Sequence, residues 1–292
     1  MTTFYEVDDN LQLVNSRGKI PNSISKEQIH KFFRDRTYRM AEDTIIQSLF
    51  FHHYLTKRNI QRFADLKLRE RRLNDYSNVI KRMWMDGTIE RFQYGMLFLY
   101  TLSEEAYEYA RDKYGNLKRR FFYRPQAHNA SKILECASLA QFHISILCGE
   151  EVRRARFYEN ILQGESTVFV PSYLEFKKNG YIYHVASYIL PKDKNSLEDF
   201  FDTIKTRINS LRGKIRHGKN DIFLQIILTP DIQSIKNTAK IISTMKEIKE
   251  TAFYFAIEEQ TIAVEGLRIL YCYHENEGEL EIETITLPNH IE

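Results

Sequence analysis

Residues 55–102 constrain the fold of this chain more than any other stretch. Thr56 stands at a helix N-cap position, and the apolar residues after it recur at the period of one helix face: Ile60, Phe63 and Ala64. A basic connector at 67–72 leads to a second helix, which we expect Asn74 or Asp75 to cap. The inward face of that helix is formed by Tyr76, Ile80 and Met83. Two helices joined in this way have the order of a helix–turn–helix.

A hairpin is predicted directly after the second helix. Gly87 lies where that helix must stop and reverse, and a glycine there suits a left-handed C-cap. Residues 89–92 and 97–102 alternate around the loop Gln93-Tyr94-Gly95, as the paired strands of a hairpin do. A helix–turn–helix followed by a hairpin is the pattern of a winged helix. Ser103 is expected to cap the helix that follows the hairpin.

The residues before this stretch predict an arm and two helices. Residues 1–24 are polar and weakly patterned, so we expect them to form an arm or a loosely held strand. Ser25 and Gln28 make a capping box for a short helix that ends near Phe33. A second helix, from about 39 to 53, is predicted from the buried side that its apolar residues form.

The second half of the chain predicts a sheet with helices on its faces. Strand-like runs at 167–176 and 181–190 flank Asn179-Gly180, which is a strong hairpin signal. Then follow, in order, a helix at 196–211, a buried strand at 222–228, a helix at 231–246, a strand at 252–257 and two further strands at 267–273 and 281–287. Strands that alternate with helices in this way predict an α/β domain.

A basic linker at 117–127, which contains Pro125, is expected to divide the chain, and a long amphipathic helix at 129–147 follows it. The expected class is therefore α+β. Its parts are an arm and short helix at 1–38, a winged helix–turn–helix at 39–116, a linker and connecting helix at 117–150, and an α/β domain at 151–292. We expect no membrane contact and a cytoplasmic protein, because the chain has no signal peptide and no run of about 18 apolar residues.

Charge separates the two halves. Residues 1–128 hold 23 Lys and Arg against 16 Asp and Glu, whereas residues 129–292 hold 19 against 23. A basic front half suits a polyanion. Helices fit the major groove of B-DNA, where Asn, Arg and Lys read base edges or hold phosphates. The candidate DNA contacts are Ser77, Asn78, Lys81 and Arg82 on the second helix, Arg91 and Tyr94 on the hairpin, Lys57 and Arg58 on the first helix, and Lys67, Arg69, Arg71 and Arg72 in the connector.

Catalytic chemistry is not expected. An endonuclease-like sheet would need an acid on one strand and a Glu-x-Lys on the next, to hold Mg²⁺ and polarise water. Ser172 stands where the acid belongs, and Glu175 and Lys177 have no acidic partner between 176 and 192. The chain also lacks a phosphate-binding loop and a nucleophile elbow. The order hairpin, helix, strand, helix, strand is compatible with a restriction-endonuclease-like core, and these departures predict that such a domain is catalytically degenerate.

The cysteines and histidines predict no metal site and no cofactor. Cys136, Cys148 and Cys272 are far apart and have no zinc-ligand spacing, so buried free thiols are the expected state. His52 and His53 are adjacent and point to different faces of a helix. His184 is interpreted as a core or surface histidine.

With these motifs in place, the chain resembles the replication-relaxation family of plasmids and integrative elements. The resemblance rests on LTKRNIQRF, VIKRMWMDGTIERF, YTLSEEAYEYAR, AHNASKILECASLAQ and VPSYLEFKKNGYIYHVASYI, and it covers most of 40–260. It implies a winged helix followed by a degenerate endonuclease-like domain. It also implies double-stranded DNA binding at a replication or conjugative transfer origin, beside a relaxase or replication initiator.

The sequence thus predicts a non-enzymatic, sequence-selective DNA-binding protein. A homodimer is expected, because one winged helix reads few base pairs and two-fold assembly doubles the contact. One alternative is a transcription regulator whose α/β domain is a sensor or dimerisation domain. Another is a winged helix that docks protein, since outward charge is often a solvated face. A nuclease with an unconventional site is the third alternative.

Overall fold

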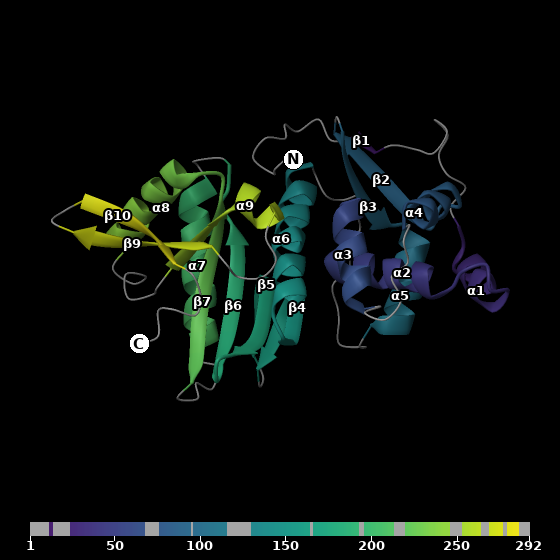
Figure 1. The fold of residues 1–292 in the computed structure, drawn as a ribbon, viewed down its shortest axis with the longest axis horizontal. Helices are drawn as coiled ribbons and strands as arrows, with labels where there is room; N and C mark the ends of the chain where they lie inside the picture. The colour runs from purple at the N-terminus through teal and green to yellow at the C-terminus, as the bar shows by residue number, and fades with distance from the viewer. Residues whose placement is uncertain are drawn as a thin grey trace. The chain divides into compact units, whose positions relative to one another are not determined.

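The computed structural model describes residues 12–13, 24–67, 76–94, 96–115, 130–163, 166–192, 196–212, 220–245, 253–263, 269–276 and 279–285. The chain divides into two compact units, residues 4–140 and residues 141–292 (Figure 1). Each unit has its own set of buried apolar residues. The predicted linker at 117–127 and its Pro125 lie outside the described residues. No described helix is long and apolar enough to cross a membrane.

The N-terminal unit is built of short helices around a small antiparallel sheet. Its elements are β1 (Gln12–Leu13), α1 (Lys26–Arg34), α2 (Met40–His52), α3 (Lys57–Lys67), α4 (Tyr76–Met85), β2 (Ile89–Tyr94), β3 (Leu97–Leu102) and α5 (Glu104–Tyr114). β1, β2 and β3 pair in that order, and Leu55, between α2 and α3, forms an isolated antiparallel bridge to Tyr100 of β3. The long helix α6 (Ala130–Gly149) comes next, and the division between the units falls within it.

Local capping signals placed these helices correctly. Ser25 and Gln28 form the predicted capping box at α1, and the hydroxyl of Thr56 accepts a hydrogen bond from the backbone N–H of Asn59 at α3. Gly87 has φ +84°, as its C-cap position after α4 requires. Ser103 does precede α5, but its hydroxyl donates to the carbonyl of Thr88 instead of capping the helix. The predicted capping residues Asn74 and Asp75 lie outside the described residues.

Apolar helix faces form the core of the N-terminal unit. The predicted inward residues of α3 and α4 are buried, among them Ile60, Ala64, Ile80 and Met83. They pack with Ile45, Ile46 and Leu49 of α2, which are also buried. The hairpin β2–β3 is longer than predicted, because residues 93 and 94 continue β2 and pair with β3.

The C-terminal unit is a mixed sheet with helices on its faces. Its strands are β4 (Val152–Gln163), β5 (Ser166–Lys178), β6 (Tyr181–Ile189), β7 (Asp221–Thr229), β8 (Phe253–Ile257), β9 (Leu270–Asn276) and β10 (Glu279–Ile285). Its helices after α6 are α7 (Leu197–Arg212), α8 (Ile232–Thr244) and α9 (Glu258–Ala263). The strands lie side by side in the order β10-β9-β8-β7-β6-β5-β4. β6, β7 and β8 run parallel, because α7 and α8 cross between them, and every other pair is antiparallel.

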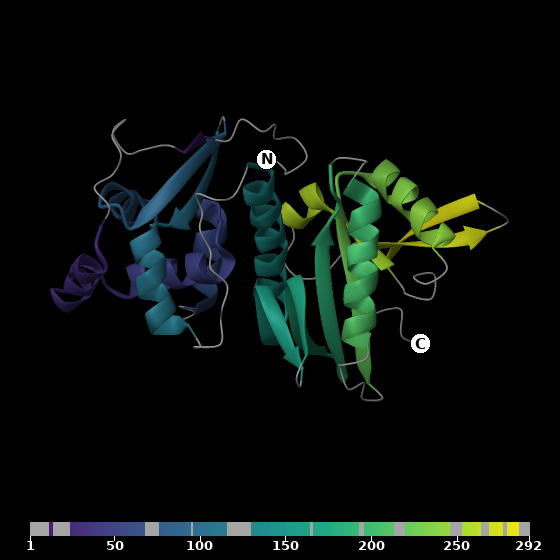
Figure 2. The same cartoon turned by 180° about the vertical axis from the view of Figure 1, so that it is seen from behind.

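Figure 2 shows α7 and α8 in front of the same face of this sheet. The predicted hairpin between β5 and β6 is present, and its turn residues Asn179 and Gly180 have φ of +51° and +85°. Two consecutive positive φ angles are those of a type I′ turn, which matches the twist of the flanking strands. The predicted cap Asp231 accepts a hydrogen bond from the backbone of Ser234 at α8.

The sequence did not predict β4 and α9. β4 begins with three arginines among its first five residues, so it lacks clean alternation. It lies at the edge of the sheet, where charged side chains remain in water and protect the edge from further pairing. A shift in register near residue 152 and a positive φ at Tyr158 interrupt its pattern further.

Candidate nucleic-acid interface

The outer face of α4 carries a continuous exposed stripe. Asn78, Lys81, Arg82 and Met85 are exposed at positions i, i+3, i+4 and i+7, opposite the buried residues of the same helix. Ser77, also predicted to face outward, is half-buried. Lys81 has no ion-pair partner among the described residues. The stripe thus combines an amide, a free ammonium and a guanidinium on one side of one helix.

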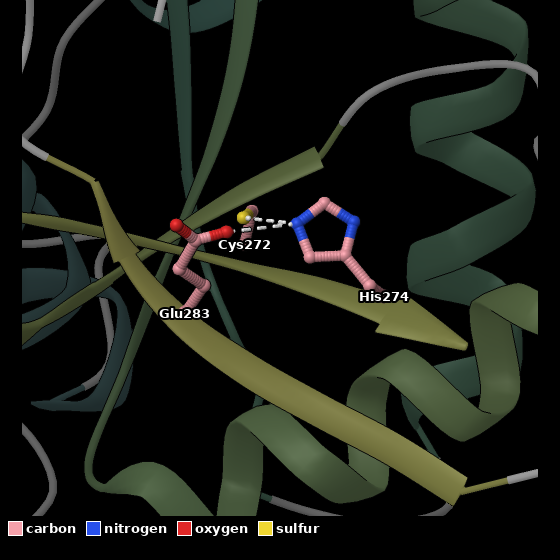
Figure 3. A group of neighbouring side chains, drawn as sticks. All are labelled: Cys272, His274 and Glu283. Atoms are coloured by element: carbon pink, nitrogen blue, oxygen red, sulfur yellow. Dashed lines mark hydrogen bonds and ion pairs between the residues drawn. The ribbon is translucent and has the colours of Figure 1, made fainter. Parts of the chain in front are cut away.

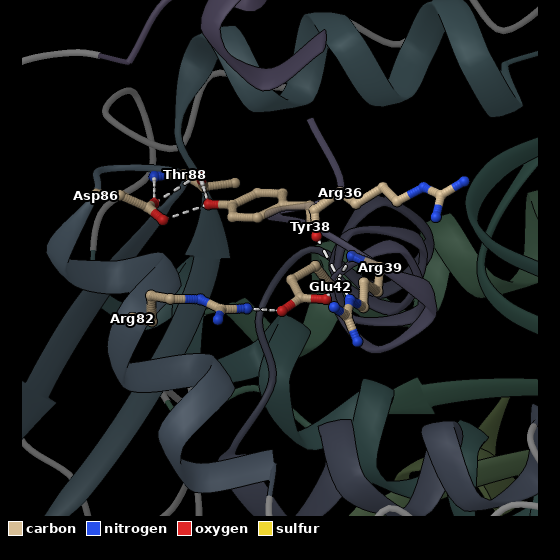
Figure 4. Close-up of polar contacts among 7 residues, drawn as sticks. All are labelled: Arg36, Tyr38, Arg39, Glu42, Arg82, Asp86 and Thr88. Atoms are coloured by element: carbon tan, nitrogen blue, oxygen red, sulfur yellow. Dashed lines mark hydrogen bonds and ion pairs between the residues drawn. The ribbon is translucent and has the colours of Figure 1, made fainter. Parts of the chain in front are cut away.

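Arg82 contacts α2. The sequence predicted its outward position but not this contact. Its guanidinium forms an ion pair with Glu42, whose side chain is only 4% exposed (Figure 4). The other carboxylate oxygen of Glu42 accepts the backbone N–H of Arg39 at the start of α2, at 2.8 Å. Arg82 is nevertheless 49% exposed. It therefore fixes α4 against α2 and still presents part of its charge to solvent.

A second polar cluster fixes the C-terminal end of α4. The buried hydroxyl of Tyr38 donates to the carboxylate of Asp86 and lies 2.6 Å from the hydroxyl of Thr88 (Figure 4). Asp86 also accepts the backbone N–H and the hydroxyl of Thr88, at 3.1 Å and 2.7 Å. Burial raises the pKa of Asp86, and the hydrogen bonds from Tyr38 and Thr88 oppose that shift. These bonds hold the turn between α4 and β2 in one conformation.

Arg91 of β2 packs against aromatic rings of α4 and β3. Its guanidinium lies 3.7 Å from the ring centroid of Trp84 and 4.7 Å from that of Phe98. Cation–π contacts of this kind hold the side chain half-buried between α4 and β3. These contacts hold Arg91 against α4 and β3, and its reach to a neighbouring DNA backbone stays a prediction.

Other predicted cations flank the stripe. Lys57 and Arg58 are exposed at the first turn of α3, and Lys67, exposed at its last, has its ammonium 5.8 Å from the centroid of the Phe63 ring. Arg69, Arg71 and Arg72 of the connector lie outside the described residues, as does the side chain of Tyr94. The sequence did not single out Met96 in the hairpin loop, which is 96% exposed.

The C-terminal unit brings together polar residues that sequence spacing left apart. The hydroxyl of Tyr173 on β5 lies 2.8 Å from Nδ1 of His184 on β6, and Nε2 of His184 lies 3.8 Å from Asp221 on β7. Glu175 pairs with His184 in the strand register. On the other side of β5, Ser172 lies 2.9 Å from His143 of α6. Asp221 is thus an acidic neighbour that comes from the third strand rather than the second.

The acidic residues of this group lie on strands that are not adjacent. Glu175 and Asp221 lie on β5 and β7, with β6 between them. Strands are about 4.8 Å apart, so the backbones that carry Glu175 and Asp221 are about 10 Å from each other. His184 on β6 pairs with Glu175 in the register, and Arg154 lies 3.8 Å from Glu175. The arrangement is that of a buried polar network.

No protein-family model matches this chain, and no curated protein is significantly similar to it. The resemblance to the replication-relaxation family therefore remains a hypothesis that rests on the motifs themselves.

Proposed function

We propose that this protein binds double-stranded DNA with sequence selectivity and without catalysing a reaction, and that its N-terminal unit is a winged helix. In that fold α2, α3 and α4 are the three helices, the bridge at Leu55 is the short strand between the first two, and β2–β3 is the wing. The observation that carries the proposal is the exposed stripe of α4. In the proposed complex α4 enters the major groove.

The stripe has the chemistry that a groove-reading helix needs. Asn78 offers an amide that can contact adenine in a bidentate way, and Lys81 and Arg82 suit guanine edges or phosphates. The two links from α4 to α2 and to Tyr38 hold the helix in place before DNA arrives. Preorganisation of this kind reduces the ordering cost of binding.

The charges around α4 support phosphate contacts from both helices. Residues 55–92 hold ten Lys and Arg against five Asp and Glu. Lys57 and Arg58 lie at the start of α3, which in a helix–turn–helix crosses the DNA backbone. Each neutralised phosphate adds about 0.9 to the slope of log affinity against log salt. Exposed cations on both helices predict a slope that corresponds to several phosphates.

We further propose that the C-terminal unit is a degenerate endonuclease-like domain that mediates dimerisation or partner docking. The role would be that of an accessory factor at a plasmid or mobile-element origin, beside a relaxase or an initiator. The support for this part is the resemblance in 40–260, together with a His184 network on the strands where such a domain would carry acidic ligands.

The test is fluorescence anisotropy of the full chain with duplexes selected from a randomised pool. We expect saturable binding that weakens steeply with salt. Lys81→Ala should lower the affinity and reduce the salt slope by about 1, the value of one lost phosphate contact. Lys236→Ala, which removes an exposed lysine from α8, is the matched control and should bind like the parent. Flat titrations, or equal losses in both variants, would contradict the proposal.

A second candidate is a protein-docking winged helix. Two exposed methionines favour it: Met85 on α4 is 50% exposed, and Met96 in the hairpin loop is 96% exposed. Exposed methionines are typical of adaptable protein-binding surfaces. If no duplex binds at low salt, this second function becomes the better account of the same surface.

A further inference from the structure

Three metal-ligating side chains lie together on the hairpin β9–β10. Cys272 of β9 pairs directly with Glu283 of β10 in the antiparallel register. His274 lies two residues after Cys272, and side chains two apart on a strand point to the same face. The thiol, the imidazole and the carboxylate therefore converge on one point of one sheet face, as Figure 3 shows.

The spacing of the donor atoms suits a small cation. Sγ of Cys272 lies 3.3 Å from Nε2 of His274, and that nitrogen lies 3.1 Å from a carboxylate oxygen of Glu283. All three donor atoms lie within 4.8 Å of one another. Tetrahedral Zn²⁺ with ordinary bond lengths separates sulfur from nitrogen by about 3.6 Å and nitrogen from oxygen by about 3.4 Å. The two pairs that involve Nε2 need shifts of a few tenths of an ångström, and the sulfur–oxygen pair, within 4.8 Å, needs a shift of at most about 1 Å to reach the value of about 3.6 Å in such a site.

One nitrogen of His274 faces two neighbouring ligand groups. The same nitrogen, Nε2 of His274, faces both the thiol of Cys272 and the carboxylate of Glu283. A proton on Nε2 can point to the carboxylate, but the nitrogen then offers no lone pair to the thiol. Without that proton, the nitrogen lone pair faces a negative carboxylate. A cation placed among the three atoms would interact favourably with all of them at once.

A further acidic residue lies beside the ligands. Glu281, which is exposed, pairs with His274 in the strand register, so its charge adds to that of Glu283 in attracting a cation. His274 and Glu283 are about 62% and 51% exposed, whereas Cys272 is buried. An ion can reach the site from solvent, and one side of it is shielded from water.

We propose that Cys272, His274 and Glu283 bind one Zn²⁺ ion, with water as the fourth ligand. Thiolate and imidazole select a borderline metal such as zinc over Mg²⁺ or Ca²⁺, which prefer oxygen donors. Sequence spacing does not reveal this site, because only the pairing of β9 with β10 brings in Glu283. The inference is independent of DNA binding, which involves the other unit.

The ion would bind within a hairpin that joins the rest of the sheet weakly. Among the described residues, β9 pairs with β8 at one position, Phe255 with Tyr271, and β10 is the edge strand. Zinc joins β9 to β10 through side chains in addition to their backbone hydrogen bonds. We therefore expect zinc to stabilise the C-terminal unit, since a ligand that binds only the folded state raises its stability.

The test uses the full-length chain, freed of metal with a chelator and titrated with Co²⁺. A thiolate-bound cobalt ion gives an intense sulfur-to-cobalt absorption in the near ultraviolet, which added Zn²⁺ should remove. We expect one cobalt ion per chain. Cys272→Ser should abolish the sulfur band, whereas Cys148→Ser, the matched control at another free thiol, should leave it unchanged.

Two further variants separate coordination from folding. His274→Ala replaces an exposed side chain, and we expect it to lower zinc affinity by more than about a hundredfold. Loss of a residue that only hydrogen-bonds to a metal ligand already lowers metal affinity by about 10- to 100-fold. Glu283→Gln should weaken binding, and Glu259→Gln, at an exposed acid of α9, should not. The proposal is overturned if wild type shows no saturable sulfur band, or if the His274→Ala protein binds zinc as tightly as wild type.

Discussion

The guanidinium of Arg82 forms an ion pair with the buried carboxylate of Glu42. This contact joins the helix proposed to read DNA to the start of α2, where Glu42 also accepts the backbone N–H of Arg39. Exposure along α4 alone would treat Lys81 and Arg82 as equivalent surface cations. The ion pair distinguishes the two residues. We expect the fold to tolerate the loss of the Lys81 side chain and to be destabilised by the loss of the Arg82 side chain.

Arg82→Ala is expected to destabilise the N-terminal unit. The substitution leaves the carboxylate of Glu42 buried without its cation. Breaking a buried pair costs about 3–5 kcal/mol, but Arg82 is half-exposed, so we expect about 1–2 kcal/mol in urea unfolding. Lys81→Ala should change stability by less than about 0.5 kcal/mol.

A double variant checks the cause of that loss. Glu42→Gln removes the charge and keeps an oxygen for the N–H of Arg39. If the uncompensated carboxylate is the cause, the protein with Glu42→Gln and Arg82→Ala should be more stable than the one with Arg82→Ala alone. Strictly additive losses would show that the ion pair contributes little.

Tyr38→Phe should cost stability through hydrogen bonds alone. The phenol is buried and bonds to Asp86 and Thr88. Its removal leaves the half-buried carboxylate of Asp86 with fewer donors, a change worth about 1–2 kcal/mol. Tyr183→Phe is the matched control, because the buried hydroxyl of Tyr183 has no hydrogen-bond partner among the described residues. The free energies of unfolding of both variants are measured with denaturant at neutral pH. Equal losses of stability in the two variants would show that the hydrogen bonds of Tyr38 do not cause its loss.

Gly180→Ala should destabilise the C-terminal unit through backbone strain. Gly180 has φ +85°, a region that a Cβ disfavours, and an added Cβ would meet no atom within 4 Å. The cost is therefore conformational, about 1 kcal/mol. Asn179→Gly, at the neighbouring position of positive φ, should be nearly neutral. Thermal unfolding of the two variants measures these costs. If Gly180→Ala lowers the stability by much more than about 1 kcal/mol, Gly180 also has a role in packing.

The parts of the fold that the sequence predicted are those that local chemistry decides. The capping box at Ser25, the stop at Gly87 and the turn at Asn179-Gly180 depend on neighbours a few residues away. Helix faces follow from a period that the chain carries in itself, which is why the outward position of Asn78 and Lys81 on α4 agrees with the structure.

The parts that it missed depend on contacts between distant segments. Arg82 meets Glu42 only when α4 packs on α2, and Glu283 meets Cys272 only when β10 pairs with β9. Asp221 joins His184 through a parallel pairing that needs the crossover helix α7. No spacing rule within one helix or strand predicts such pairs. Sequence analysis of single elements therefore treats these residues as isolated polar side chains.

His52 gives a prediction about pH. Its ring is fully buried, its Nδ1 lies 3.1 Å from the carbonyl of Ser48, and burial lowers its pKa to about 4. In the unfolded chain the pKa is near 6.5. Between these values the unfolded state binds the proton and the folded state does not, so folding becomes less favourable as pH falls from about 7 to about 4. The contribution is fully present above pH 7, and its loss amounts to about 3 kcal/mol by pH 4.

His52→Gln removes that titration while keeping an amide that can donate to the carbonyl of Ser48. Carboxylates also titrate below pH 5, so the informative window runs from about pH 7 to about pH 5. The parent should lose more unfolding free energy across this window than the variant, even if the variant is less stable at pH 7. Parallel pH dependence in the two proteins would mean that His52 takes up its proton without unfolding, and that the packing around Phe63, whose ring lies 5.4 Å from the imidazole, admits a charge.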